Sequence, residues 1–328
     1  MKKRDVINII ILVAVIAFGA ISFANRKYTF SDTKFLMDTI VDIKIETKDK
    51  DAEFVIDAAF EIINEYEKVL SFYDQDSELW KFNNSITNSM PLDEDLLQVF
   101  FLSEQLYHDS DSLYDITIGA LSELWDFNKL HIPSEDSIKI ALENVGFEKL
   151  TLEGVHLTKP EGVKINLGSL AKGYIIDKVV EYLVSEEIES GFVNAGGDMR
   201  IFGQKKPLRI GIQHPRNSRN ELIGVLNIKN NAVVTSGDYA RFFELDGNRY
   251  HHILNPKTGY PAEGTVSVTV VAPTALFADA YSTALFLMEP QKAIELIDRT
   301  DMLEAVIYYL EGSEIKKFES DGIKHYIN

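Results

Sequence analysis

The order in which the apolar residues change their spacing restricts this chain to a mixed fold. Apolar and charged residues alternate from 39 to 46, which predicts a half-buried strand, and a helical spacing follows from 52 to 70. Further helical patterns cover 96–107, 169–183, 275–288 and 291–299, and strand patterns cover 163–167, 208–212, 222–228, 232–235, 265–272, 305–310 and 323–327. Because strands and helices do not alternate regularly, the pattern argues against a doubly wound fold and predicts an α+β domain with mainly antiparallel sheets and packed helices.

A basic start and an apolar run mark the N-terminus. Basic residues at 2–4 precede an apolar run from 6 to 24, an arrangement typical of a secretory signal or a membrane anchor. The run has about the length of a transmembrane helix, roughly 17–25 residues, and the segment 22–24 resembles a signal-peptide cleavage site. We therefore expect residues 1–30 to form a transmembrane anchor or signal helix. Residues 31–328 are expected to form the folded domain at the cell membrane, on its extracytoplasmic side.

Composition excludes several classes of function. The formal net charge of −18 argues against nucleic-acid binding, which needs clustered Lys and Arg. The absence of cysteine excludes disulfides, thiolate metal sites and a cysteine nucleophile. A phosphate-bearing ligand would therefore need a metal ion or backbone N–H groups to balance its charge.

Two turns and one helix carry small and polar residues in patterns that suit a ligand site. The segments 194–198 (Asn-Ala-Gly-Gly-Asp) and 235–239 (Thr-Ser-Gly-Asp-Tyr) each follow an apolar strand and could present backbone N–H groups or hydroxyls, although each could equally be a plain turn. Asp279 and Thr283 are four residues apart and share one helix face. A carboxylate and a hydroxyl together suit Mg²⁺, while complementing the helix dipole is the alternative role for Asp279.

A rigid loop with two histidines forms the remaining motif. The segment 251–261 reads His-His-Ile-Leu-Asn-Pro-Lys-Thr-Gly-Tyr-Pro, and such loops often position catalytic groups. His252 is our candidate general base, because the ordinary pKa of histidine lies close to neutral. His251, on the other side of an extended chain, is expected to tolerate substitution better. A surface histidine pair beside a structural turn is the alternative for this stretch.

Taken in chain order, these motifs resemble the FAD:protein FMN transferases, the ApbE family. The resemblance runs from about Met37 to Leu287 and rests on eight ordered matches. They are 37–39; 70–74 with Ser77 and Asn83; 114–119 with 124–125; 166–174 with Asp177; 194–198; 235–239; 252–261; and Asp279 with Thr283.

The resemblance implies a fold, a ligand set and a reaction. It implies a T-fold-like α+β domain that uses FAD as its substrate. The implied FAD contacts are Met37, Asp115, Ile116, Thr117, Asn166, Lys172 and Ile253, and the implied Mg²⁺ ligands are Ser169, Asp279, Ser282 and Thr283. Ser169 is expected to act through its backbone carbonyl. Mg²⁺ would neutralise charge on the leaving AMP, a base would take the proton of a Thr or Ser hydroxyl, and FMN would be joined to an acceptor flavoprotein.

The sequence departs from the family pattern in several places. Asn166 and Asn255 stand where Asp is usual, and Lys257 where Arg is usual. Asp38 and Ala120 replace a common Gly and a common Pro. The neutral amide of Asn166 is expected to make a weaker flavin contact than a carboxylate would.

Two other functions remain open from the sequence. In a Mg²⁺-dependent FAD pyrophosphatase, water would replace the protein hydroxyl and the products would be FMN and AMP. A flavin-binding protein without turnover is the other, and the joint presence of His252, Asp279 and Thr283 argues against it.

Overall fold

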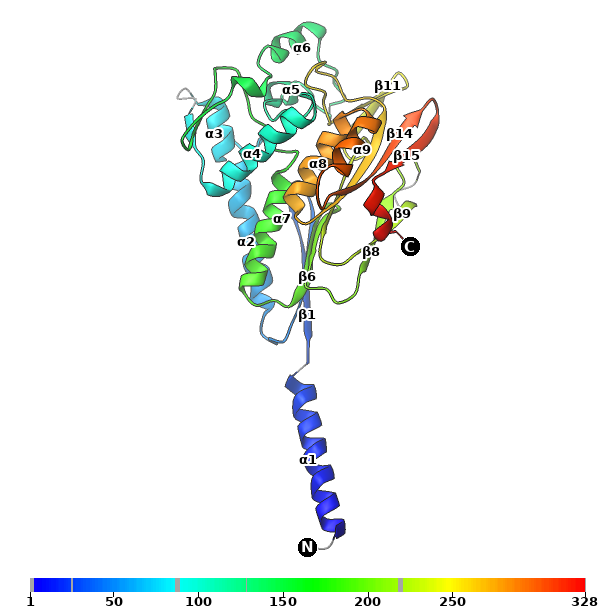
Figure 1. The fold of residues 1–328 in the computed structure, drawn as a ribbon. Coiled ribbons are helices and arrows are strands. Elements are labelled where there is room, and N and C mark those ends of the chain that lie inside the picture. Colours follow the sequence, from blue (N-terminus) through cyan, green and yellow to red (C-terminus); the bar gives the residue numbers. More distant parts are fainter. Residues whose placement is uncertain (1–2, 25, 86–88, 128, 218–220, 328) are drawn as a thin grey trace.

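The structure, a computed structural model, describes residues 3–24, 26–85, 89–127, 129–217 and 221–327. An eight-stranded sheet forms the centre of the domain (Figure 1). Its strands, in spatial order, are β1 (Tyr28–Leu36), β2 (Thr39–Thr47), β6 (Ser190–Ala195), β7 (Asp198–Phe202), β10 (Ala232–Gly237), β13 (Thr265–Ala272), β14 (Glu304–Glu311) and β15 (Glu314–Glu319). Every neighbouring pair is antiparallel, which confirms the α+β prediction.

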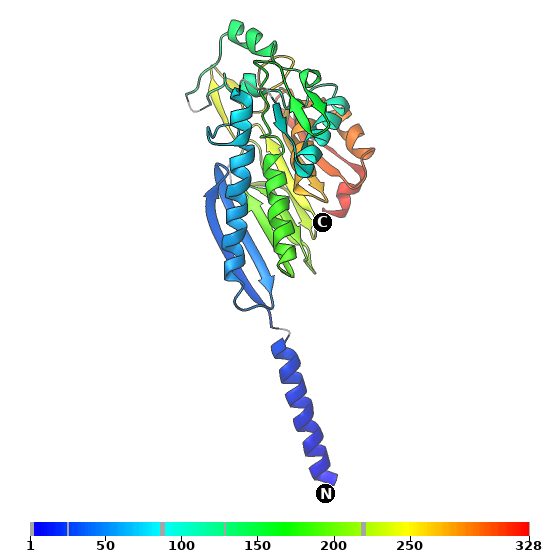
Figure 2. The ribbon, with the colours of Figure 1, turned by 90° about the vertical axis from the view of Figure 1, so that its left-hand side faces the viewer.

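Long helices cover one face of this sheet. They are α2 (Glu53–Leu70), α4 (Glu94–Asp109), α7 (Ala171–Ser185), α8 (Ala275–Leu287) and α9 (Pro290–Asp298). Figure 2 shows α2 and α7 side by side along the sheet. α7 packs against β6 and β7, and α8 packs against β10 and β13. The helix that carries the 169–174 motif and the helix that carries Asp279 are therefore neighbours on the same sheet.

Shorter elements complete the domain. The helices are α3 (Glu78–Asn84), α5 (Gly119–Ser122), α6 (Glu135–Leu142), η1 (Phe147–Lys149) and η2 (Asp321–His325). The strands are β3 (Ser89–Pro91), β4 (Thr151–Glu153) and β5 (His156–Thr158), then the pairs β8 (Leu208–Gln213) with β9 (Leu222–Ile228) and β11 (Phe242–Leu245) with β12 (Asn248–His251). Apolar residues of β8, β9 and η2 pack on the face of the main sheet opposite the long helices, around Ile212, Leu226 and Ile323.

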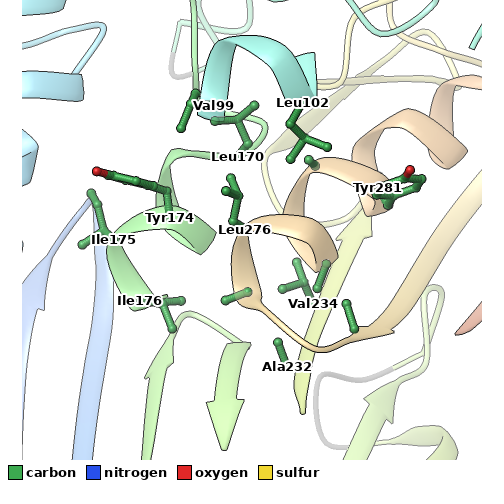
Figure 3. Packing of buried hydrophobic residues seen from close by; sticks show 14 of the residues in the cluster. Val99, Leu102, Leu170, Tyr174, Ile175, Ile176, Ala232, Val234, Leu276 and Tyr281 are labelled. Carbon is green, nitrogen blue, oxygen red and sulfur yellow. The ribbon is translucent and has the colours of Figure 1, made fainter. Parts of the chain in front are cut away.

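The main core lies between the sheet and the long helices (Figure 3). Leu170 and Tyr174 approach Leu276 between α7 and α8, and Val99 and Leu102 of α4 close this space from above. Leu170 is 1% exposed, and a fully buried aliphatic side chain of this size stabilises the fold by about 1.5–3 kcal/mol. The apolar packing of α7 against α8 therefore fixes the relative position of the polar groups at the ends of these helices.

The N-terminal helix α1 (Lys3–Ala24) projects away from the domain (Figure 1). Apolar side chains along it, such as Ile10, Val15 and Phe18, are more than half exposed. Among the helices that the structure describes, none combines the length and the apolar character that crossing a membrane requires. The first strand, β1, begins at Tyr28.

Two predicted strands are wrong, for local reasons. In the segment 163–167, both backbone groups of Ile165 bond to the Asn83 side chain and not to a neighbouring strand. The Ile165 N–H donates to Asn83 Oδ1 at 2.8 Å, and Asn83 Nδ2 donates to the Ile165 carbonyl at 2.7 Å. The segment 323–327 overlaps η2, in which Ile323 is fully buried. Alternating apolar residues over such short stretches do not distinguish a strand from one helical turn.

Candidate active site

Close contact between α7 and α8 is the basis of the candidate site. Gly173, in the first turn of α7, touches α8 so closely that a Cβ atom at this position would lie 2.2 Å from the Ala275 carbonyl oxygen. The Gly173 N–H donates to Asp279 Oδ2 at 2.9 Å. The helix α7 has no side-chain cap from its own N-cap residue, Leu170, so Asp279 complements this N-terminus from the neighbouring helix.

Three hydroxyl groups contact one another near Asp279 of α8. Ser282 Oγ donates to the Asp279 carbonyl at 2.9 Å and lies 2.7 Å from Ser236 Oγ of β10. Ser236 Oγ is also 3.3 Å from Thr283 Oγ1. We call Ser236, Asp279, Ser282 and Thr283 the hydroxyl–carboxylate cluster. The cluster presents only oxygen donors, and it joins three of the implied metal ligands.

The fourth implied ligand, Ser169, lies just before α7. Its hydroxyl donates to Tyr114 Oη at 2.8 Å. The Leu170 carbonyl accepts the Tyr174 N–H, as in a regular helix. The Gly173 N–H would bond to the Ser169 carbonyl in the same way, but it donates to Asp279 instead. The hydroxyl of Ser169 is therefore held by the protein, which leaves the backbone carbonyl as the oxygen suited to a ligand role.

Lys172 and Asp198 add a positive and a second negative charge to the site. Lys172 Nζ forms an ion pair with Asp198, the last residue of the Asn-Ala-Gly-Gly-Asp turn. Burial opposes the charge of Lys172, but Asp198 and Asp279 hold the pKa of its ammonium group above the usual range. Burial and the charge of Asp198 raise the pKa of Asp279. Two carboxylates thus face one ammonium group, an arrangement in which an added cation is favourable.

The segment 115–117 is tied into the protein by its own side chains. Asp115 Oδ1 accepts the N–H and the hydroxyl of Thr117, and Asp115 Oδ2 accepts the Phe147 N–H at 3.0 Å. The Ile116 carbonyl accepts the Asn166 N–H at 2.7 Å. Asn166 Nδ2 donates to Ser122 Oγ, and its Oδ1 accepts the Gly168 N–H. These predicted FAD contacts thus form one connected strip, in which the Asp115 carboxylate shapes the loop.

The two histidines of the rigid loop lie in different surroundings. His252 is exposed, and its backbone N–H donates to the Arg241 carbonyl at 3.1 Å. Partial desolvation by the surrounding protein, together with the positive charges of Arg241 and Lys172, lowers the pKa of His252. Its ring is therefore neutral near pH 7 and able to accept a proton. Ile253, which follows it, is 6% exposed.

Met37 lies at the tip of the β1–β2 hairpin. Its backbone has a φ of 52° and that of Asp38 a φ of 55°, in the left-handed region that turns of this type require. The Met37 N–H donates to Glu67 Oε1 at 2.9 Å. Asp38 Oδ2 lies 3.9 Å from Arg241 Nη2, and the Arg241 carbonyl accepts the His252 N–H. These contacts bring the hairpin tip toward the histidine loop.

The donor set fits a hard divalent cation. Mg²⁺ takes oxygen ligands and usually only one or two carboxylates from the protein, with water and substrate phosphates filling the rest. Asp279, the hydroxyls of Ser282 and Thr283 and the Ser169 carbonyl match that preference. Within the part of the chain that the structure describes, no group of three or more His, Asp or Glu side chains could hold a metal ion.

Comparison with known proteins identifies the family. Residues 37–307 match the model of the ApbE family. The FAD:protein FMN transferase of Escherichia coli K12 is 33% identical over 275 residues, covering 80% of this chain and 78% of the relative. That of Klebsiella pneumoniae strain 342 is 31% identical over 294 residues, covering 86% and 89%.

Solved structures agree with this result. The crystal structure of the ApbE protein of Thermotoga maritima superimposes with a TM-score of 0.83 at 32% identity, covering 92% of this chain and all of that one. The flavin transferase ApbE of Vibrio cholerae gives a TM-score of 0.83 at 26% identity with the same coverage. The fold and the relatives thus define a transferase enzyme. The chain belongs to the ApbE family, and a flavin-binding protein without turnover is set aside.

Several contacts between residues of the site could not be predicted from the sequence. Gly173, Asp198 and Ser236 all lie inside motifs visible in the sequence, yet nothing there shows that Gly173 contacts Asp279 or that Ser236 contacts Ser282. Arg241 lies outside every motif. Its role depends on the β11–β12 hairpin bringing the Arg241 carbonyl to His252, a contact that only the fold reveals.

Proposed function

We propose that this enzyme transfers the FMN part of FAD to a Thr or Ser hydroxyl of an acceptor flavoprotein, with release of AMP, in a Mg²⁺-dependent reaction. The observation that carries the proposal is that an oxygen-donor cluster, a partly exposed lysine and an exposed histidine lie in one site. Its relatives, named FAD:protein FMN transferases, support the same reaction.

Each part of the site has a task in this reaction. Asp279, Ser282, Thr283 and the Ser169 carbonyl would hold Mg²⁺. When bound, Mg²⁺ supplies positive charge that stabilises the departing AMP phosphate. Lys172, placed between Asp198 and Asp279, adds a fixed positive charge for the pyrophosphate. Met37, Asp115–Thr117, Asn166 and Ile253 would hold and orient FAD.

The proton transfer falls to His252. Its neutral ring accepts the proton of the acceptor hydroxyl as the oxygen attacks the FMN phosphorus, the bond from phosphorus to the AMP oxygen breaks, and AMP leaves. An exposed base suits a macromolecular acceptor, because a hydroxyl on another protein must approach it from solvent. Attack by water in place of the acceptor would give FMN and AMP, which is the pyrophosphatase alternative.

A metal-ligand variant tests the proposal. Asp279→Asn retains an oxygen for the Gly173 N–H but removes the charge that attracts the cation, so AMP release should lose its dependence on Mg²⁺ and fall by at least about 100-fold. The exposed Asp301→Asn serves as a matched control and should behave as the wild type. If Asp279→Asn turns over FAD normally at limiting Mg²⁺, the metal site is placed wrongly.

The location of the enzyme is a separate part of the proposal. We infer that the catalytic domain lies outside the cytoplasmic membrane, attached or exported through residues 1–30. The basic residues at 2–4 and the exposed apolar side chains of α1 support this inference. Protease treatment of intact protoplasts should degrade the catalytic domain. A protected domain would contradict this location, and release into the medium would indicate cleavage of the N-terminal segment.

A further inference from the structure

The helices α7 and α8 run antiparallel and cap each other. Asp279 of α8 accepts the Gly173 N–H in the first turn of α7. One turn further along, Asp177 of α7 accepts the N–H groups of Ala275 and Leu276, at 2.9 and 2.8 Å, in the first turn of α8. Each carboxylate thus complements the N-terminus of the helix that carries the other.

The carboxylate of Asp177 is buried and has hydrogen-bond partners that compensate for its burial. It is 9% exposed, and Arg200 Nη1 of β7 donates to its Oδ1 at 2.9 Å. Two backbone N–H groups and a guanidinium offset the desolvation of this carboxylate. Thr274 accepts the N–H of Phe277, the next residue of α8. The first turn of α8 is therefore fixed from two sides, by its own N-cap and by Asp177.

The contacts of Asp177 with the first turn of α8 lie close, along the helix, to the residues that would bind the metal. Ala275 and Asp279 are one helical turn apart, and so are Asp177 and Gly173 on α7. A rotation or slide of α8 that broke the Asp177 contacts would also move Asp279 away from the Gly173 N–H. Ligands that hold Mg²⁺ must keep near-ideal octahedral geometry, so small displacements are costly.

From this arrangement we propose that Asp177 is a positioning residue for the metal site, acting through the N-terminus of α8. It does not touch the cation or FAD. It fixes the turn of α8 from which Asp279, Ser282 and Thr283 reach the site. The inference rests on the proposed function, because it assumes that these residues bind Mg²⁺.

Metal-dependent thermal stability tests this role without measuring activity. The full-length protein is titrated with MgCl₂ in the presence of FAD, and the rise in melting temperature gives the half-saturating Mg²⁺ concentration. Asp177→Asn keeps the size of the side chain but removes the charge, so this concentration should rise about 10-fold or more, as for other residues that orient metal ligands. The shift that FAD alone produces should not change.

A matched variant separates positioning from general stability. Asp93 caps α4, where its Oδ1 accepts the Leu96 N–H at 2.8 Å. Asp93→Asn makes the same chemical change at another helix and should leave the half-saturating Mg²⁺ concentration at the wild-type value. If Asp177→Asn lowers only the melting temperature and keeps wild-type Mg²⁺ dependence, the positioning role is wrong.

Two further results complete the test. Arg200→Gln removes the ion pair but leaves both backbone contacts of Asp177, and it should raise the half-saturating concentration by a smaller factor. If Asp177→Asn does not fold and Arg200→Gln shows wild-type Mg²⁺ dependence, the inference fails. A wild-type protein without any Mg²⁺-dependent shift would instead contradict the proposed metal site itself, and the inference with it.

Discussion

His251 and His252 are neighbours in sequence but have opposite surroundings. His251 is 4% exposed, its Nε2 lies 2.8 Å from the Ala262 carbonyl, and its Nδ1 accepts the Ile253 N–H at 3.3 Å. These contacts fix the tautomer with the proton on Nε2. His252 is exposed. The buried ring thus anchors the loop, and the neighbouring exposed ring is available for chemistry.

Replacing His252 should remove the base. We expect His252→Ala to lower the rate of FMN transfer by about 10²–10⁴-fold, the usual range for general acid–base catalysis. FAD affinity should change little, because a base acts in the transition state. Single-turnover transfer assays and flavin fluorescence titrations measure the two quantities separately. Loss of FAD binding with an unchanged transfer rate on bound FAD would assign His252 to substrate binding.

The pH dependence of transfer should reflect the lowered pKa of His252. Because desolvation and neighbouring positive charges lower the pKa of its ring below the ordinary value of about 6.5, the ring stays neutral at pH 7 and above and should cause no loss of rate there. Rate constants are measured at saturating Mg²⁺ and FAD. A limb near pH 6.5 that disappears in His252→Ala would show that the ring titrates normally and that its surroundings are described wrongly.

His251 is buried, so its replacement should affect the stability of the fold. The sequence-based prediction that His251 tolerates alanine better than His252 concerns FMN transfer and stays a prediction. His251→Ala would leave the Ala262 carbonyl and the Ile253 N–H without their partner, at a cost of about 1–3 kcal/mol in the free energy of unfolding. Urea denaturation measures this loss. His252→Ala is the comparison, since an exposed ring should cost less than about 0.5 kcal/mol, and equal losses would contradict the anchoring role.

The fold was largely predictable where hydrophobic patterns are long. The strand 265–272 and the helix over 275–288 are confirmed to within one residue, because a buried strand and an apolar helix leave strong periodic signals. The apolar strand expected before residue 194 corresponds to β6, but its bounds were not predicted, and β7 was not predicted at all. β6 is short and starts with Ser190 and Gly191, and β7 begins at Asp198, so neither shows an apolar run at its start. Glycine is required at 191 because a Cβ atom there would lie 2.4 Å from the Lys44 carbonyl oxygen of β2.

The motifs of the site could be predicted from the sequence, but the contacts between residues of different motifs could not. Spacing along a helix placed Asp279 and Thr283 on one face without the fold. The pairing of Lys172 with Asp198, and of Ser236 with Ser282, joins residues on different elements and depends on the strand order β7-β10-β13. Such contacts follow from tertiary packing, which residue spacing does not encode.

Gly173 provides a test of the close approach between α7 and α8. Because a Cβ atom there would meet the Ala275 carbonyl, Gly173→Ala should force the helices apart and destabilise the domain by about 1–3 kcal/mol, as overpacking does. The intrinsic preference of alanine for helices acts in the opposite direction by about 1 kcal/mol. Thermal unfolding with and without Mg²⁺ measures both the fold and the metal site. A more stable variant with normal Mg²⁺ dependence would show that the contact is not tight.

The most direct test of the central claim is the mass of the acceptor. The enzyme is incubated with FAD, Mg²⁺ and the flavin-accepting domain of an acceptor flavoprotein, and a matched domain whose acceptor Thr is replaced by Val is treated in parallel. The account predicts that the Thr domain gains one FMN through a phosphoester while one AMP appears per FMN joined, and that the Val domain stays unmodified. Release of free FMN and AMP with both domains unmodified would contradict transfer and identify the enzyme as an FAD pyrophosphatase.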